Sequence, residues 1–243
     1  MRAQRPLFTT AVPAAEFAER RAAVMRAIGD GVAVLQGATE RPVYKQFRQS
    51  AQFFYLTGVE VPRAMLVIDG RAKTSTLFLP ARDERMERSE GPVLSPGPDA
   101  ERITGLERVA DRAAFDEALA AIAAEGRQIF TTFRPEALEA STPSQGNTHA
   151  RKTAEDKWDG RKTREEIFRE KLAAASPKSE IADLDRVLDG MRLVKSASEI
   201  RLVREASRLA GEALMEAMRV ARPGMGEHEI EAVGDYVFKA HGS

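Results

Sequence analysis

The sequence predicts an α/β fold, and three observations support that prediction. Short apolar runs rich in β-branched residues, which are typical of strands, lie at 32–36, 64–68 and 74–80. Segments with apolar residues at helical spacing lie at 13–29 and 111–126. Helices and strands therefore alternate along this part of the chain, as they do when helices cover the faces of a sheet.

The composition limits the classes of partner. The 243 residues are 43% hydrophobic and 30% charged, which is enough to form a sizeable core. Lys and Arg together number 37, as do Asp and Glu, so there is no cationic excess to neutralise nucleic acid or an anionic membrane. The chain has no Cys, no apolar leader and no apolar stretch of about 20 residues. We therefore expect a cytoplasmic protein that binds neither nucleic acid nor a membrane.

The first predicted helix, residues 13–29, is amphipathic. Phe17, Arg21, Val24 and Ile28 share one face, and Gly29 follows as a helix stop. The strands at 64–68 and 74–80 flank the sequence "DGRAK", which predicts a hairpin.

Aromatic residues gather in the short stretch 53–56, "FFYL", which we predict to be a further strand whose alternate side chains pack onto helices. The second predicted helix begins at Asp111 and ends at Gly126. Residues 128–133, "QIFTTF", then predict another strand of the sheet.

A polar segment rich in Pro and Gly runs from 134 to 166 and predicts a long surface loop. Loops of this length inside a compact domain are uncommon, and they are usually functional, lids or poorly ordered. The sequence does not separate these three interpretations.

The last third of the chain predicts two amphipathic helices. Ser196 and Glu199 have the spacing of a capping box at the start of the first helix, and Pro223 and Gly224 end it. The second helix begins near 226. Both helices have an apolar face for which the sequence offers no partner.

Candidate metal motifs in the sequence are incomplete. His228 and Glu229 resemble the start of a zinc HExxH motif, but Ala232 occupies the position of the second His. A calcium loop at 183–190 would need a carboxylate at its twelfth position, and its apolar residues have helical spacing instead. We interpret that segment as a solvated helix face.

No catalytic constellation emerges from the residues themselves. His149, His228 and His241 have no Cys, Asp or Glu partner at metal-type spacing, so we interpret all three as surface residues. No GxSxG nucleophile motif occurs. We therefore predict no catalytic, cofactor-binding or metal-binding residue in this chain.

Two stretches carry a family resemblance. "FRQSAQFFYLTG" at 47–58 and "RLVKSASEI" at 192–200, with the segments around them in the same order, resemble the aminopeptidase P (Xaa-Pro aminopeptidase) family of pita-bread metallopeptidases. The resemblance covers most of the chain except the polar segment 134–166. It implies a mixed-sheet N-terminal domain at 1–190 and the incomplete start of a pita-bread catalytic domain at 191–243.

The resemblance implies a metal-dependent aminopeptidase as the parent protein. In the family, two Asp, one His and two Glu hold two divalent metals, usually manganese, and a bridging hydroxide attacks the peptide bond before proline. These ligands lie downstream of the two final helices, so we expect no bound metal and no activity in this chain alone. Two alternatives stay open: a non-catalytic relative that binds peptides or proteins, and a creatinase- or prolidase-like hydrolase.

The same resemblance suggests an interface role for Arg48, Gln49, Phe54 and Tyr55. In the family the N-terminal domain helps to build homo-oligomers and forms a wall of a neighbouring subunit's active site, which limits access to short peptide ends. The resemblance also implies that the parent protein acts on peptides with proline at the second position. Arg48 and Gln49 are predicted to fix a loop by hydrogen bonds, with a local salt bridge as the alternative.

The chain departs from the family at two places. Residues 41–44 lack an acidic residue that some relatives carry there, and a Trp-Asp-Gly triplet lies at 158–160 rather than after "FLP" at 78–80.

Overall fold

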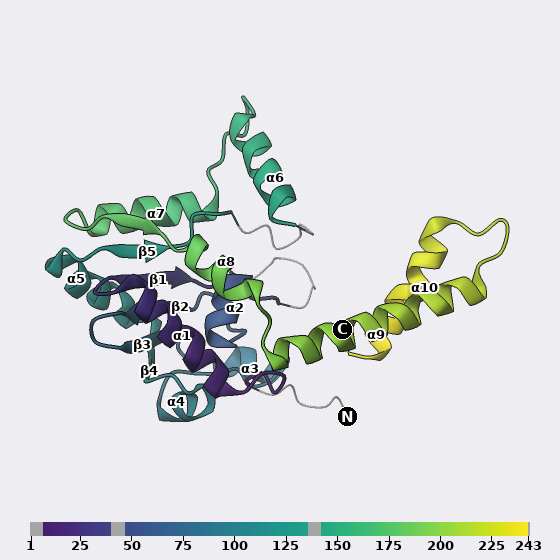
Figure 1. Cartoon of the computed structure of the whole chain (residues 1–243), viewed down its shortest axis with the longest axis horizontal. Coiled ribbons are helices and arrows are strands. Elements are labelled where there is room, and N and C mark those ends of the chain that lie inside the picture. Colours follow the sequence, from purple (N-terminus) through teal and green to yellow (C-terminus); the bar gives the residue numbers. More distant parts are fainter. Residues whose placement is uncertain (1–6, 40–46, 136–141, 243) are drawn as a thin grey trace. The chain divides into compact units, whose positions relative to one another are not determined.

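The computed structural model describes residues 7–39, 47–135 and 142–242 of the chain (Figure 1). The chain divides into two compact units, residues 1–193 and 194–243. The first unit contains a sheet with helices on both faces, and the second contains two helices.

The sheet of the first unit has six strands in the order β4-β3-β2-β1-β5-β6. Strands β1, β2 and β3 are antiparallel, and β4, β5 and β6 join as parallel neighbours of β3, β1 and β5. This mixed sheet confirms the predicted fold class. The strand bounds are β1 Val32–Gln36, β2 Met65–Asp69, β3 Thr74–Leu79, β4 Arg108–Asp111, β5 Ile129–Thr131 and β6 Ile181–Asp183.

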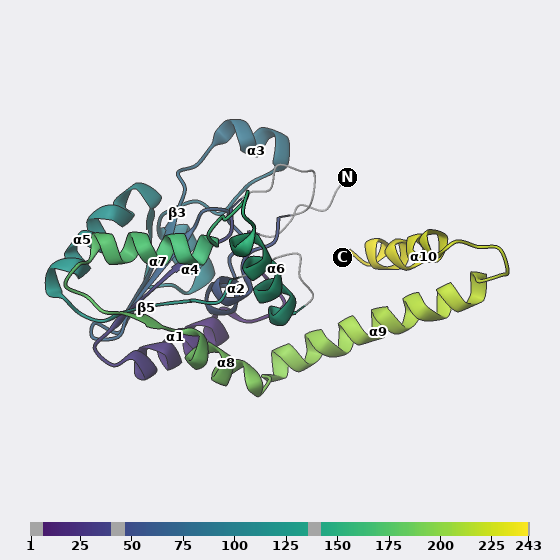
Figure 2. The same ribbon diagram turned by 90° about the horizontal axis from the view of Figure 1, so that it is seen from above.

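Both faces of the sheet are buried, so the central strands are almost continuously apolar. Alternate residues of β1 enter different cores: Ala33 and Leu35 face one, and Val32 and Val34 face the other. The first core is covered by α1 (Ala14–Ile28), α2 (Ala51–Thr57), α4 (Pro98–Thr104) and α8 (Asp185–Leu193). The second is covered by α5 (Phe115–Glu125) and α7 (Arg164–Ala175), which Figure 2 shows on the side of the strands opposite α1.

The predicted strand at 53–56 is wrong, because these residues lie in the helix α2. Aromatic residues favour strands, but here Phe53, Leu56 and Thr57 are buried at helical spacing. Gly58 ends the helix with φ +66°, a left-handed conformation that glycine adopts without strain, and its N–H donates to the Phe54 carbonyl. Three aromatic residues of the chain, Phe53, Phe54 and Tyr55, thus lie in one short helix.

The predicted long loop at 134–166 is also wrong in part, because it contains α6 (Pro143–Glu155) and the start of α7. Both helices begin with a capping box, in which Thr142 pairs with Gln145 and Thr163 pairs with Glu166. These two Thr-x-x-Gln/Glu patterns are visible in the sequence. The low apolar content of α6 made its helix hard to predict.

Several short elements were not predicted: β4, β6, α4, α3 (Glu84–Glu90) and the 3-10 turn Arg112–Ala114. The segment 183–190 does enter a helix, α8, as its apolar spacing predicts. The expected solvated face is wrong for Asp185, which is 3% exposed.

The second unit consists of α9 (Ala197–Val220) and α10 (Glu227–Ala240). The Ser196–Glu199 capping box is confirmed, with the Ser196 hydroxyl accepting from the Glu199 N–H at 3.1 Å. Leu209, Ala213 and Val237 are buried, whereas many apolar side chains of α9 and α10 are exposed. Across the described ranges, none of the helices combines the length and apolarity needed to span a membrane.

Candidate functional site around helix α2

The four residues singled out in the sequence have different environments. Gln49 and Tyr55 are buried, Phe54 is half-buried and Arg48 is exposed. Gln49 precedes α2, and Phe54 and Tyr55 lie within it. The structure therefore brings three of the four to the boundary between α2 and the core, while Arg48 faces solvent.

Gln49 fixes the chain on both sides of α2. Its Oε1 accepts from the N–H groups of Ala38 at 2.5 Å and Ser50 at 2.9 Å, and its Nε2 donates to the Val61 carbonyl at 3.0 Å. A Cβ on Gly37 would lie 3.0 Å from the Gln49 amide, so glycine permits this close approach. The single amide side chain thus joins the end of β1 to the segments before and after α2.

Two arginines of α1 satisfy the carbonyl groups at the end of α2. Arg20 donates to the Tyr55 carbonyl at 3.0 Å, and Arg21 donates to the Leu56 carbonyl at 3.1 Å. The last carbonyls of a helix have no partner within it and carry partial negative charge, so cations stabilise this end. The C-terminal end of α2 is therefore stabilised by side chains of α1.

Arg21 is the centre of a buried polar network. It also donates to Ser75 Oγ at 3.0 Å and to the Gly105 carbonyl at 2.9 Å, and it is 1% exposed. Burial lowers the pKa of Arg21, and the Glu107 carboxylate opposes this shift. Arg21 thereby links α1, α2, β3 and the residue after α4.

The aromatic ring of Tyr55 lies close to two guanidinium groups. The Cζ atom of Arg20 is 4.2 Å from its centroid and that of Arg192 is 5.5 Å away, both within the range of cation–π attraction. The Tyr55 hydroxyl donates to the Met191 carbonyl at 3.3 Å, and Arg192 donates to Gln52 Oε1 at 3.0 Å. Arg192, near the end of α8, thus contacts the stretch 47–58.

The residues that the sequence analysis missed here are the arginines. Arg21 occupied the apolar face of the first predicted helix, and a charged residue among apolar ones is a signal of a buried, hydrogen-bonded group. Arg192 begins the stretch 192–200, but its partners Gln52 and Tyr55 are 140 and 137 residues away, so no local pattern could assign them.

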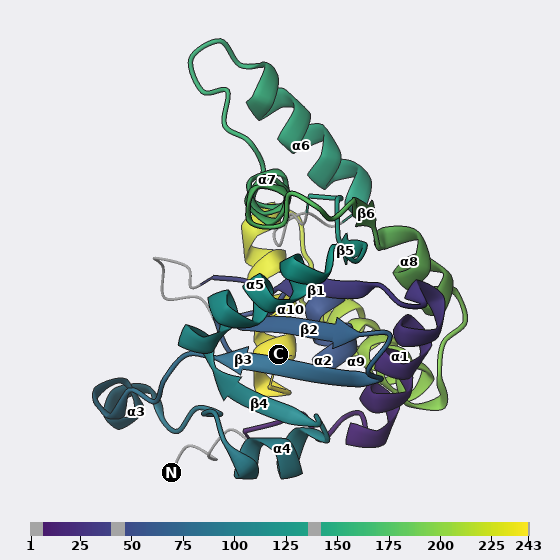
Figure 3. The same ribbon diagram turned by 90° about the vertical axis from the view of Figure 1, so that its left-hand side faces the viewer.

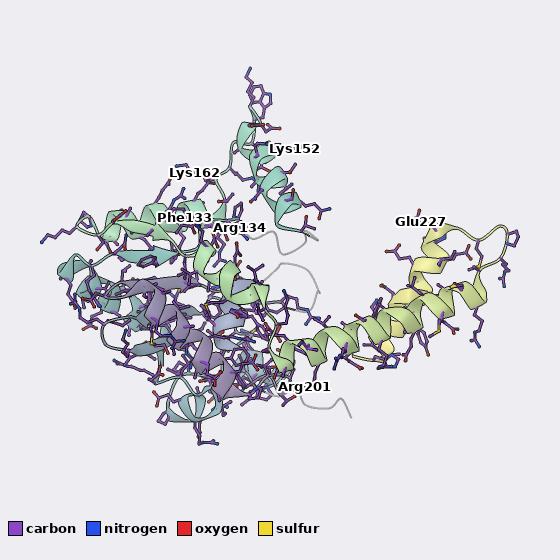
Figure 4. All side chains as sticks on the ribbon, viewed as in Figure 1. Phe133, Arg134, Lys152, Lys162, Arg201 and Glu227 are labelled. Atoms are coloured by element: carbon purple, nitrogen blue, oxygen red, sulfur yellow. The ribbon has the colours of Figure 1, made fainter. Side chains whose placement is uncertain are left out.

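A second polar cluster lies where β5 ends. Asp185 Oδ2 accepts from the N–H groups of Phe133 at 2.9 Å and Arg134 at 2.8 Å. The Arg134 guanidinium forms a bidentate pair with Asp189 at 3.3 and 2.5 Å. Burial raises the pKa of Asp185, and its Oδ1 has no hydrogen-bond partner among the described residues. Figure 4 labels Phe133 and Arg134 beside α8.

Neither cluster brings three potential metal ligands together among the described residues. Within the described part of the chain, His, Asp and Glu side chains do not gather in groups of three or more that could hold a metal ion. His149, His228 and His241 are exposed, and His241 Nε2 lies 3.7 Å from Glu212 Oε2. Both polar clusters position backbone segments.

Comparisons with known proteins agree with this architecture. Residues 17–130 match the aminopeptidase P, N-terminal domain. The chain is 27% identical to the Xaa-Pro aminopeptidase of Haemophilus influenzae over 237 residues, which cover 95% of this chain and 48% of that protein. The Xaa-Pro aminopeptidase of Escherichia coli K12 is also 27% identical, with 94% of this chain and 49% of that protein covered.

Solved structures give the same result. The aminopeptidase PepP of Pseudomonas aeruginosa is 27% identical and superposes with a TM-score of 0.69, covering 96% of this chain and 50% of that one. The chain thus spans about half the length of the curated relatives it matches. The resemblance found in the two sequence stretches is confirmed, and residues 17–130 of this chain are an aminopeptidase P N-terminal domain.

Proposed function

We propose that this chain is the N-terminal portion of a metal-dependent Xaa-Pro aminopeptidase, which hydrolyses the peptide bond before a proline at the second position. One observation carries the proposal: the similarity to Xaa-Pro aminopeptidases extends over about 95% of the chain, beyond the N-terminal domain and into the second unit. We accordingly assign residues 1–190 to the N-terminal domain and 191–243 to the start of the catalytic domain.

The metal centre belongs to the proposal but not to this chain. Two divalent ions, with manganese as the expected metal, would supply the activated hydroxide. The described residues do not fit such a centre, because they contain no group of three or more potential ligands. No catalytic step is therefore assigned to them, and the chain alone is expected to be inactive.

The role that we propose for the first unit is to assemble a homo-oligomer and to restrict access to the active site. The exposed Arg48 and the half-buried Phe54 lie beside the firmly held Gln49 and Tyr55, so a partner subunit would meet a surface with fixed geometry. We further propose a cytoplasmic location, which suits a chain without Cys.

Peptidase assays test the function. We expect the protein encoded by the complete reading frame to release the first residue from Xaa-Pro peptides when manganese is present, and residues 1–243 to release none. Manganese-dependent turnover by 1–243 would contradict the proposal. A complete protein that binds Xaa-Pro peptides without cleaving them, or that cleaves only creatine, would replace it with one of the two alternatives.

Oligomer formation is tested separately by analytical ultracentrifugation of the complete protein. We expect Arg48→Glu to lower the association constant, since Arg48 is exposed and its loss should leave the fold intact. Arg26→Glu, at an exposed position of α1, serves as the matched control. Equal association constants for both variants would remove Arg48 from the interface.

A further inference from the structure

The segment 142–163, here called the arm, comprises α6 and the turn that follows it. Figure 3 shows α6 leading away from the strands of the sheet. We propose that the arm is a docking surface for an acidic segment of a partner protein, with Trp158 as its apolar anchor. This role is separate from the peptidase function.

Trp158 is unusually exposed for its residue type. It is the only Trp of the chain, and it is 89% exposed. Tryptophan is largely buried in most folded proteins, and a Trp side chain removes about 150–250 Å² from water when it is buried. Trp is also among the residues that contribute most to binding at protein interfaces. Its exposure therefore indicates a contact that this chain does not itself supply.

The turn that carries Trp158 is held in place by its own hydrogen bonds. Asp156 Oδ1 accepts from the N–H groups of Trp158 at 2.7 Å and Asp159 at 3.0 Å. Gly160, with φ +61°, donates its N–H to the Thr153 carbonyl at 3.1 Å and so returns the turn to α6. A preorganised turn loses little conformational entropy on binding. Trp158 is thus presented by a folded element.

The charges around Trp158 favour carboxylates. Arg151, Lys152 and Lys157 are exposed, and Lys157 Nζ lies 5.2 Å from the centroid of the Trp158 ring. The opposing Asp159 carboxylate is paired with Arg161 at 2.5 and 2.8 Å. The side chain of Lys152 points outward from α6 in Figure 4.

A peptide fits this charge pattern better than a phosphate array does. Glu155, Asp156 and Asp159 lie among the cations of the arm and would repel the evenly spaced phosphates of nucleic acid or an anionic bilayer. The carboxylates of a peptide can be spaced to avoid them. The arm therefore suits a segment with a few Asp or Glu residues beside one large apolar residue.

Arg134 and Arg164, which flank the arm in the sequence, are both fixed within the first unit. Before it, Arg134 is tied to α8 through Asp185 and Asp189. After it, Arg164 donates to the Gly37 carbonyl, and Gln36 Nε2 donates to the Arg164 carbonyl at 3.2 Å. The bonds of Arg164 hold the chain directly after the docking surface to the end of β1.

Fluorescence anisotropy with labelled peptides tests the proposal on the full 243-residue chain. The probe is a fluorescein-labelled peptide, Asp-Glu-Leu-Phe-Asp-Glu; one control replaces Leu-Phe with Ser-Ser, and a second replaces the acidic residues with Lys. We expect the probe to bind at least about tenfold more tightly than either control, and to weaken as salt is raised. The emission of the sole Trp should also shift to shorter wavelength.

Variants locate the contact. We expect Trp158→Ala to weaken binding about tenfold, the effect of losing one anchor residue, and Lys157→Gln to weaken it by a smaller factor. Tyr236→Ala and Lys171→Gln, at exposed positions outside the arm, should leave binding unchanged. Trp158 is exposed, so its replacement should not unfold the chain; circular dichroism checks this.

Three results would overturn the proposal: equal affinities for the three peptides, equal affinities for Trp158→Ala and Tyr236→Ala, or a Trp emission shift that occurs only with anionic vesicles or with rising protein concentration.

Discussion

Helices α2 and α9 are both amphipathic, yet they depend on opposite sources of stability. Helix α2 has seven residues, and its ends and one face are held by Gln49, Arg20 and Arg21 from other segments. Helix α9 has 24 residues and its own capping box, while Met218 and other apolar side chains are exposed. Isolated helices shorter than about 12–15 residues are marginal in water. The short helix therefore exists because of tertiary contacts, and the long one is specified by its own sequence.

The largest expected effect comes from removing the support of α2. We expect Arg21→Ala to lower the free energy of unfolding by about 3–5 kcal/mol, because it removes the buried cation near Glu107 and the hydrogen-bond donor of the Leu56 and Gly105 carbonyls. Urea denaturation measures this change, with Arg26→Ala at an exposed position of the same helix as the control. A loss below 1 kcal/mol would show that α2 needs no such support.

The second-largest effect is expected at Gln49, with its neighbour Arg48 as the control. Gln49→Ala should cost about 2–3 kcal/mol, since the buried N–H groups of Ala38 and Ser50 lose their acceptor. Arg48→Ala, one residue earlier and exposed, should change the free energy of unfolding by less than about 0.5 kcal/mol. Equal free energies of unfolding for Gln49→Ala and Arg48→Ala would show that the hydrogen bonds of Gln49 do not stabilise the fold.

A fall in pH should change the contributions of Asp69 and Asp185 to the free energy of unfolding in opposite directions. The hydrogen bonds from Arg127 lower the pKa of Asp69 from 3.8 to about 2, so ionised Asp69 stabilises the fold above pH 3.8 and this contribution is lost as the pH falls toward about 2. Burial raises the pKa of Asp185, so its ionised form lowers stability and protonation relieves that cost.

We therefore expect Asp69→Asn to reduce the loss of stability between roughly pH 5 and pH 2, by about 1 kcal/mol after solvent screening. Asp185→Asn should make that loss steeper. Urea denaturation across this pH range checks both, and changes of the same sign would refute the assignment.

A smaller effect should come from the contact between α2 and the end of α8. A double-mutant cycle that combines Tyr55→Leu with Arg192→Met should give a coupling energy of about 0.5–1 kcal/mol, from the cation–π contact. The same cycle with the exposed Arg102→Met should give none. Zero coupling in the first cycle would mean that Arg192 contacts the Tyr55 ring without stabilising the fold.

The smallest effect is expected on the exposed face of α9. Met218→Ser should change the free energy of unfolding of residues 1–243 by less than about 0.5 kcal/mol, because this side chain is 79% exposed. Leu209→Ser, at a buried position of the same helix, should cost more. If the complete protein buries this face of α9, Met218→Ser should cost about 1–3 kcal/mol there. An equally small cost in both proteins would place Met218 outside any core.

Much of the fold could be predicted because its signals are local. The hairpin of β2 and β3, the helices α1 and α5, and the capping box of α9 all follow from the spacing of neighbouring residues. The short elements β4, β6 and α4 carry too few residues for a periodic pattern. They form because the sheet and its helices supply partners that are distant in the sequence.

The candidate site was predicted less well than the fold. The sequence identified Gln49 and Tyr55 as unusual, but it misplaced them beside a strand and left out Arg20, Arg21 and Arg192. The hydrogen bonds from these arginines to α2 span 35 residues or more. No local pattern reports a partner at such a separation.

The sequence by itself determined the α/β class, the helices α1, α5, α9 and α10, and the family resemblance, because apolar spacing and caps act within a few residues of the chain. Only the tertiary structure decided that the aromatic stretch 53–56 is a helix and that Asp185 is buried. The physical reason is that a short segment gains too little from its own hydrogen bonds to fix its conformation, so distant charged and polar side chains decide it.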